Sequence, residues 1–218
     1  MRSVRVKICG ITSEKDLAIA ANAGADALGF VVNVLSSPRN ISIQRAGEMM
    51  RHVPVFTKRV VVSVPSTLND LKKVFMKLKP DALQIHGKLI SEIQEIRTML
   101  PKSRLIGSLQ VSRNTLQVDF KSLKQFDGLL LDTNVKGKYG GTGVIHDWEV
   151  SKRVRELIDP VPLILAGGLN PSNVKEAIRI VQPYAVDVSS GVETVPGIKD
   201  PKKIVEFIEN AKVVKLCN

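Results

Sequence analysis

The chain has 218 residues, with 32 Lys and Arg against 21 Asp and Glu, a formal net charge of +11 and only 4% aromatic residues. No apolar run reaches the ~18 residues of a membrane span or resembles a signal peptide, and Cys9 and Cys217 form no CxxC pair. These features argue against a membrane protein, a disulfide framework or a zinc site, and they predict a cytoplasmic protein. No nucleic-acid partner is expected, because base stacking needs aromatic residues. The positive charge suits a small anionic substrate instead.

Short apolar segments and amphipathic segments alternate eight times along the chain. The amphipathic segments predict helices that are capped by residues such as Ser13 and Ser42, and Asn170-Pro171 is expected to begin the seventh helix. The apolar segments predict strands at residues 4–10, 26–32, 58–64, 81–87, 104–111, 127–132, 161–168 and 184–192. The helices are expected at about 13–23, after 42, and at 67–78, 91–100, 116–124, 147–158, after 170 and at 200–211.

Eight strand and helix units of about 27 residues each are long enough for parallel crossover connections. Continuous apolar strands indicate a parallel sheet that is covered by helices, so the sequence predicts a single α/β domain, residues 1–218, folded as a (β/α)8 TIM barrel. A doubly wound open sheet is the alternative, because periodicity alone does not prove that the sheet closes.

The active site of such a barrel lies at the C-terminal ends of its strands. Glycine clusters follow strands six, seven and eight, where backbone N–H groups can approach a phosphate. No Walker motif or strand-GxGxxG-helix unit is present, so the phosphate is assigned to a substrate and no cofactor is predicted; no His, Asp and Glu cluster has metal-ligand spacing. The candidate residues at these strand ends are Cys9, Arg39, Gln84, His86, Asp132, Gly167, Gly168, Ser189, Ser190 and Gly191.

Cys9 and Asp132 follow strands that lie three apart around the predicted barrel, so they should face each other across its mouth. Each has a simpler interpretation, Cys9 as a small buried residue and Asp132 as a cap for the following loop. Together they form a thiol and a carboxyl suited to moving protons on a sugar phosphate. Arg39 is either a solvated loop cation or a ligand for a carboxylate, and His86 is expected to be a hydrogen-bonded residue at a strand end.

With these residues in place, the chain resembles the phosphoribosylanthranilate isomerase family over nearly its whole length. The motifs that carry the resemblance are KICGIT (7–12), SPR (37–39), LQIHG (83–87), LLLDT (129–133), GGTG (140–143), LAGGLNPSNV (165–174), VDVSSGVET (186–194) and PGIKD (196–200). The segment VVNVLS before SPR lacks the aromatic residue and prolines that are often found in the family.

The resemblance implies an Amadori rearrangement of N-(5-phosphoribosyl)anthranilate in tryptophan biosynthesis, with Asp132 as general acid and Cys9 as general base. It implies that Arg39 holds the anthranilate carboxylate. It also implies that the phosphate is held by Gly141, Thr142, Gly143, Gly167, Gly168, Ser190 and Gly191. Cys9 would need a lowered pKa and Asp132 a raised one, and Lys7 is expected to point away from Cys9.

Other interpretations stay open at this point. A sugar-phosphate epimerase or indoleglycerol-phosphate synthase would need metal ligands, paired acids or lysines at the strand ends, and a non-catalytic anion or nucleic-acid binder would use the basic surface. The enzyme is expected to be a monomer or a homodimer.

Overall fold

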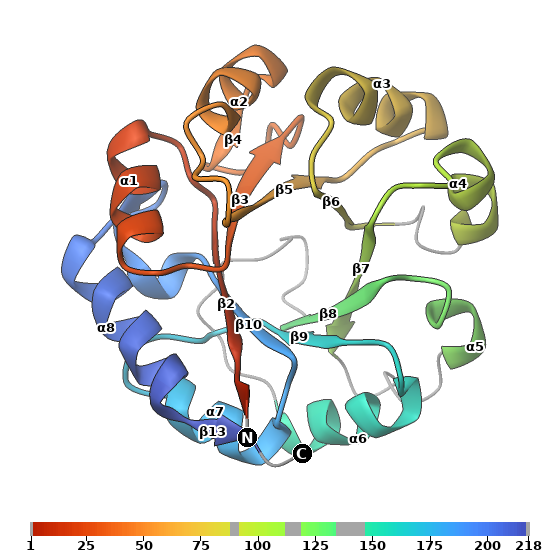
Figure 1. The fold of residues 1–218 in the computed structure, drawn as a ribbon. Helices are drawn as coiled ribbons and strands as arrows, with labels where there is room; N and C mark the ends of the chain where they lie inside the picture. Colours follow the sequence, from red (N-terminus) through yellow and green to blue (C-terminus); the bar gives the residue numbers. More distant parts are fainter. Residues whose placement is uncertain (1, 88–91, 112–118, 134–146, 217–218) are drawn as a thin grey trace.

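Eight parallel strands close into a barrel in the computed structural model, which describes residues 2–87, 92–111, 119–133 and 147–216 (Figure 1). Each strand pairs with the next in chain order, and the circle closes because β2 pairs with both β3 and β10. The predicted TIM barrel is therefore confirmed and the open sheet is wrong. The barrel strands are β2 (Arg5–Cys9), β3 (Ala27–Val32), β5 (Lys58–Ser63), β6 (Ala82–Ile85), β7 (Leu105–Val111), β8 (Gly128–Thr133), β9 (Leu163–Leu165) and β10 (Ala185–Val188).

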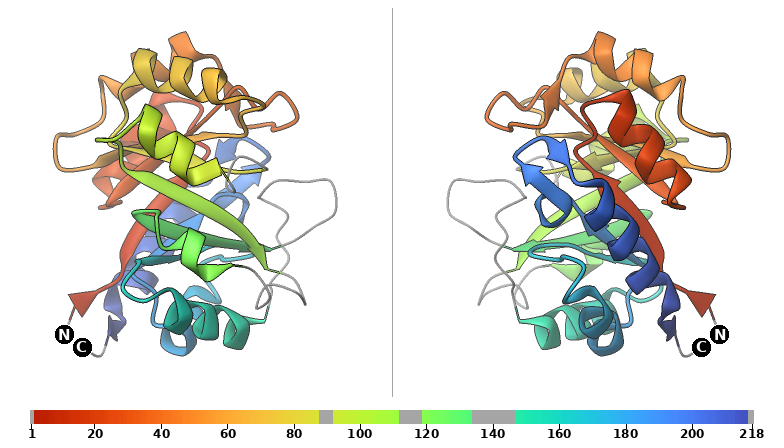
Figure 2. Two further views of the ribbon diagram at one scale, coloured as in Figure 1. Left: turned by 90° about the vertical axis from the view of Figure 1, so that its right-hand side faces the viewer. Right: turned by 90° about the vertical axis from the view of Figure 1, so that its left-hand side faces the viewer.

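A ring of helices surrounds the barrel (Figures 1 and 2). Ser13 and Ser42 cap the first two helices, each accepting a hydrogen bond from a backbone N–H three residues on. The helices are α1 (Glu14–Asn22), α2 (Ile43–Met50), α3 (Leu68–Leu78), α4 (Ile93–Met99), α5 (Phe120–Leu123), α6 (Trp148–Ile158), α7 (Val174–Val181) and α8 (Pro201–Val213). In the described residues, the helix predicted at 116–124 is reduced to the four residues of α5.

The predicted start of the seventh helix is wrong by about one turn. Asn170 does not cap a helix at Pro171; its side chain accepts hydrogen bonds from the backbone N–H and the hydroxyl of Ser172. This Asx turn competes with helical hydrogen bonding, and α7 begins only at Val174.

Short strands outside the barrel were not predicted. Strands β1 (Arg2–Ser3) and β13 (Lys215–Leu216) pair with each other and bring the two ends of the chain together at one end of the barrel (Figure 2). Strand β4 (Asn40–Ile41) extends the sheet beside β3. The last predicted strand, 184–192, ends at Val188 because a 3₁₀ turn (Ser190–Val192) follows, and a hairpin of β11 (Glu193–Val195) and β12 (Ile198–Lys199) comes next.

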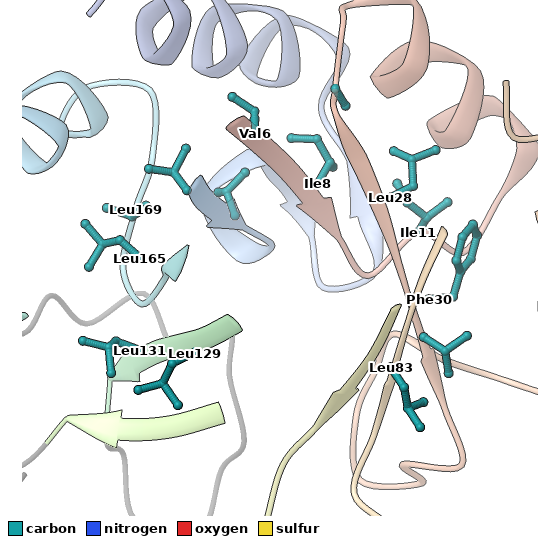
Figure 3. Packing of buried hydrophobic residues seen from close by; sticks show 14 of the residues in the cluster. Val6, Ile8, Ile11, Leu28, Phe30, Leu83, Leu129, Leu131, Leu165 and Leu169 are labelled. Atoms are coloured by element: carbon teal, nitrogen blue, oxygen red, sulfur yellow. The ribbon is translucent and has the colours of Figure 1, made fainter. Parts of the chain in front are cut away.

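Strand alternation divides the buried side chains into two layers. One face of each strand packs against the helices in a large apolar cluster, part of which is shown in Figure 3. On β2, Val6 and Ile8 belong to this outer layer, whereas Cys9 belongs to a smaller cluster inside the barrel. Polar and chargeable side chains on the inner face therefore point toward the barrel axis, which is where a site can form.

Candidate active site

One pocket at the C-terminal ends of the barrel strands gathers most of the residues predicted from the sequence. Cys9 and Asp132 both line it, and the strands that carry them, β2 and β8, lie three apart in the closed sheet. The other predicted residues that line it are Arg39, Gln84, His86, Gly167, Gly168, Ser189 and Ser190. Gly191 does not line it, and Gly141, Thr142 and Gly143 lie outside the described residues.

Cys9 ends β2 and is buried among the apolar side chains of Val31, Val34, Val60 and Val62. This burial raises the pKa of the Cys9 thiol, because an apolar environment disfavours the thiolate. The expectation of a lowered pKa is therefore wrong for the ligand-free protein.

Lys7 does not point away from Cys9. Two residues apart on one strand share a face, so Lys7 extends into the barrel beside the thiol, and the predicted orientation contradicted this rule. Its Nζ donates a 2.9 Å hydrogen bond to Oδ1 of Asp187, and both side chains are buried. Lys7 is the largest influence that lowers the pKa of Cys9, while Asp187 raises it. Asp187 was not predicted as a site residue, although its alternation with Val186 and Val188 could have revealed it.

Asp132 lies near the end of β8, with its carboxylate toward the pocket. Its Oδ1 accepts a 2.8 Å hydrogen bond from the backbone N–H of Thr133, the next residue along the chain. Burial raises the pKa of Asp132 to about 6, and the nearby charge of Asp187 acts in the same direction. The carboxyl therefore carries a proton in a minority of molecules near neutral pH, and its pKa is raised as a general acid requires.

The glycines after β9 and β10 make room for close backbone packing at this end of the barrel. Gly167 and Gly168 both have positive φ, +79° and +67°, a conformation that favours glycine. A Cβ at Gly191 would collide with the carbonyl oxygen of Leu169, so the turn after β10 packs directly on the loop after β9. Gly191 therefore allows the two loops to pack closely, while Gly167, Gly168 and Ser190 line the pocket.

Gln84 of β6 and His86, which follows the last residue of that strand, are hydrogen bonded to each other, with 2.8 Å between their Nε2 atoms. Burial lowers the pKa of His86 to about 4, and the positive charge of Lys7 contributes to the decrease. The ring is therefore neutral at physiological pH. The Oε1 atom of Gln84 is buried and has no hydrogen-bond partner among the residues that the structure describes.

Arg39 is not a solvated loop cation; its side chain is buried in the loop after β3 and is held by Glu193 of the hairpin after β10. Its Nε and Nη2 atoms donate hydrogen bonds of 2.8 and 2.6 Å to the two carboxylate oxygens of Glu193. Lys199 donates a 2.8 Å hydrogen bond to the same carboxylate and also bonds the carbonyl oxygen of Ser189. Glu193 and Lys199 were missed by sequence reasoning, since nothing local links residues 154 positions apart.

The described part of the chain shows neither a metal site nor a membrane-spanning helix. No group of three or more His, Cys, Asp or Glu residues there is placed to hold a metal ion. No helix in the same ranges has the length and apolar character needed to cross a membrane.

Comparison with known proteins gives a consistent family. Residues 6–210 match the family model described as N-(5'phosphoribosyl)anthranilate (PRA) isomerase. A relative from Methanothrix thermoacetophila, named N-(5'-phosphoribosyl)anthranilate isomerase, is 45% identical over 209 residues, which cover 95% of this chain and 98% of the relative.

Solved structures agree with this result. The crystal structure of phosphoribosyl anthranilate isomerase from Thermotoga maritima has a TM-score of 0.85 at 38% identity, covering 97% of this chain and 100% of that one. A second isomerase structure, in complex with reduced 1-(o-carboxyphenylamino)-1-deoxyribulose 5-phosphate, has a TM-score of 0.82 at 37% identity over 97% of this chain and 100% of that one. The chain belongs to the N-(5'-phosphoribosyl)anthranilate isomerase family.

Proposed function

We propose that Asp132 and Cys9 are the general acid and general base of this isomerase, which converts N-(5-phosphoribosyl)anthranilate to 1-(2-carboxyphenylamino)-1-deoxyribulose 5-phosphate. The observation that carries the assignment is the shared pocket, in which a carboxyl with a pKa of about 6 lies on one wall and a buried thiol on another. Two groups that act on different atoms of one sugar need such a separation.

The reaction balances with these two residues alone. The Asp132 carboxyl gives its proton to the ribose ring oxygen as the bond from C1 to that oxygen breaks, and C1 and the anthranilate nitrogen form a protonated Schiff base. The Cys9 thiolate then removes the proton from C2, and the electrons of the C–H bond form a C1–C2 double bond and neutralise the nitrogen. The resulting enolamine tautomerises to the ketone without a further catalyst.

The remaining pocket residues fit the two ends of the substrate. We assign the phosphate to the corner formed by Gly167, Gly168 and Ser190, where glycine allows backbone N–H groups to approach an anion. The family resemblance adds Gly141, Thr142, Gly143 and Gly191 to this phosphate site. We assign the anthranilate ring to the apolar wall near Val31, Val34 and Val62, with Arg39 at its edge to bind the carboxylate.

The proposed mechanism needs the proton on Asp132 and not on Cys9, although this is the less populated of the two arrangements. Asp132 must be protonated and Cys9 ionised, whereas the raised pKa of the thiol and a carboxyl pKa of about 6 favour the reverse arrangement at neutral pH. A substrate that brings its own charges and excludes water can move this proton without changing the net charge of the pair.

The experiment that tests the assignment measures isomerisation, through the loss of phosphoribosylanthranilate fluorescence, in Cys9→Ala and Asp132→Asn variants. Each should lower turnover by at least ~10², because a positioned acid or base contributes about that much. Cys217→Ala and Asp119→Asn are the matched controls; Asp119 is an exposed helix cap, and Asn also caps helices. Near wild-type turnover in either pocket variant would remove that residue from the mechanism.

We also propose the setting in which the enzyme works. One domain, residues 1–218, carries the activity as a monomer or a homodimer in the cytoplasm, on a small phosphorylated substrate and without a nucleic-acid partner or cofactor. One solved structure describes monomers generated from a dimeric isomerase of Thermotoga maritima, so a related protein is dimeric and can be obtained as a monomer. Sedimentation of the purified enzyme across its working concentrations would distinguish the two.

A further inference from the structure

We propose that Lys7 is a positioning residue for the isomerisation, held charged and in place by Asp187 so that its ammonium group stabilises the thiolate of Cys9. This inference rests on the proposed role of Cys9 as the base. It adds a second function to β2, which would supply both the base and the cation that makes the base available.

The register of strands β2 and β10 brings Lys7, Cys9 and Asp187 together. Lys7 and Cys9 share the inner face of β2, and Asp187 lies directly opposite Lys7 on the neighbouring strand β10. The 2.9 Å bond between Nζ of Lys7 and Oδ1 of Asp187 fixes the end of a side chain that is otherwise long and flexible. Only 4% of the Lys7 side chain and 9% of the Asp187 side chain are exposed, so water screens this pair weakly.

Gly29 on β3, the other neighbour of β2, has no side chain and so leaves room for the side chains of Cys9 and Lys7. Gly29 lies opposite Cys9 on β3. A Cβ built on Gly29 would stand 2.8 Å from Sγ of Cys9 and 3.1 Å from Cε of Lys7, so both side chains pack over the same bare backbone. The end of the lysine side chain is therefore beside the sulfur, with no side chain from β3 between them.

The charged groups that surround Cys9 leave Lys7 as the cation best placed to act on it. His86, just after β6, is neutral, Asp132 on β8 and Asp187 on β10 are acidic, and Arg39 is paired with Glu193. Lys199 of β12 also lowers the pKa of Cys9, but less than Lys7 does, and it too is bonded to Glu193. The pKa of Lys7 itself is raised by Asp187 and Cys9 despite burial, so its ammonium group stays charged.

Stability alone is a poor explanation for this ion pair. Removing two charges from water costs about as much as their attraction returns, and apolar replacements of similar volume are often neutral or stabilising. The position of this ion pair inside the barrel, next to the proposed base, is better explained if Lys7 stabilises the thiolate of Cys9.

The experiment measures the rate of alkylation of Cys9 by iodoacetamide as a function of pH, in a Cys217→Ala background so that one thiol reacts. Lys7→Met should raise the apparent pKa of the thiol by at least one unit, which means about tenfold less thiolate at a fixed pH below that pKa. Lys7→Arg, which keeps a cation on the strand, should restore most of the thiolate. Arg5→Met is the matched control, because it removes a cation from the exposed start of the same strand.

A second variant keeps the test decisive if Lys7→Met fails to fold with Asp187 unpaired. Lys7→Met/Asp187→Asn removes both charges, and the thiol pKa should still rise because Lys7 influences Cys9 more than Asp187 does. An unchanged or lower thiol pKa in the folded single or double variant would overturn the proposal. The titration needs no turnover, so it is independent of the test of Cys9→Ala, and a failure of one proposal can be told from a failure of the other.

Discussion

Arg39 reaches the pocket with two of its three guanidinium nitrogens already bonded to Glu193. The third nitrogen, Nη1, makes no hydrogen bond to any described residue, and Arg39 lines the pocket. Because the guanidinium group is planar, a bidentate carboxylate on one edge fixes the direction of the remaining amino group. Glu193, in turn, is fixed by Lys199, whose side chain is completely buried.

We predict that Glu193→Gln weakens binding of the substrate without slowing its chemistry. The amide of Gln has one acceptor oxygen, so it cannot accept both hydrogen bonds that Arg39 donates to Glu193. Arg39 then loses its fixed orientation. We expect KM to rise about tenfold, equivalent to about 1.4 kcal/mol of binding free energy. The value of kcat should stay within about twofold, since Arg39 is assigned to the carboxylate and not to a reacting atom. Steady-state kinetics of the isomerase provide the measurement.

Glu206→Gln is the matched control for this change, because Glu206 is an exposed residue of α8 and lies on the same C-terminal part of the chain. A fall in kcat with an unchanged KM would show that Glu193 acts on the chemical step, contrary to the orientation argument.

We predict that Gly167→Ala damages both stability and turnover. Gly167 has a φ of +79°, and a Cβ there would stand 2.6 Å from the backbone nitrogen of Thr133 and 3.1 Å from Oδ1 of Asp132. The strained conformation should cost roughly 1–3 kcal/mol of unfolding free energy, and the displaced carboxylate should lower kcat by at least ~10-fold. Urea unfolding and steady-state kinetics measure the two effects.

Gly47→Ala is the control for Gly167→Ala. Gly47 is in the middle of α2, where a Cβ would make only an ordinary contact of 3.5 Å with Leu78, so alanine should stabilise the helix by about 0.5–1 kcal/mol. If both alanine variants behaved alike, the close packing at Asp132 would not matter for activity.

The sequence predicted the strands and their order well because each has a continuous apolar run, and it predicted the pocket because strand ends meet at one side of a barrel. Lys7 was placed on the wrong face although alternation alone was enough to place it correctly. The late start of α7 depends on a competition between an Asx turn at Asn170 and a helix cap, which residue preference does not decide. The contact of Arg39 with Glu193 joins two loops far apart in sequence, so it needed the folded structure.

We predict a flat pH dependence of kcat/KM between about pH 6 and the raised pKa of Cys9. In this range, each unit of pH lowers the protonated fraction of Asp132 tenfold and raises the thiolate fraction of Cys9 tenfold, so their product is constant. Below about pH 6 the carboxyl is already protonated and the rate should fall tenfold per unit as thiolate is lost. Initial rates at subsaturating substrate across this range measure the profile.

The phosphate of the substrate also titrates near pH 6, so the carboxyl needs an independent measurement. Carbon-13 NMR of labelled aspartates should show one carboxyl with a midpoint of about 6 that is absent from Asp132→Asn. Asp119, whose pKa is lowered by its hydrogen bond with Ser122, should titrate well below it in both proteins. A midpoint for Asp132 near the ordinary value of aspartate would show that Asp132 does not cause the change of slope of kcat/KM near pH 6.

We predict that His86 makes the folded protein less stable as the pH falls, and that Asp132 hides this effect in the wild type. The unfolded chain takes up a proton at His86 below about pH 6.5, but the folded chain does so only below about 4, so stability is lost as the pH falls through this window. Asp132 acts in the opposite direction, because its folded pKa of about 6 lies above the ordinary 3.8, and the folded state gains a proton first.

The contribution of His86 should therefore be visible in an Asp132→Asn background. From pH 7 to pH 4, we expect Asp132→Asn to lose roughly 3 kcal/mol more unfolding free energy than Asp132→Asn/His86→Gln, since the pKa difference of His86 converts at about 1.4 kcal/mol per unit. Urea unfolding at the two pH values gives the difference, and Asp132→Asn/His52→Gln is the control because His52 is exposed. Equal losses in all three proteins would mean that the folded state accepts a proton at His86 as readily as the unfolded chain does, and the ring could then not be the neutral, buried partner of Gln84.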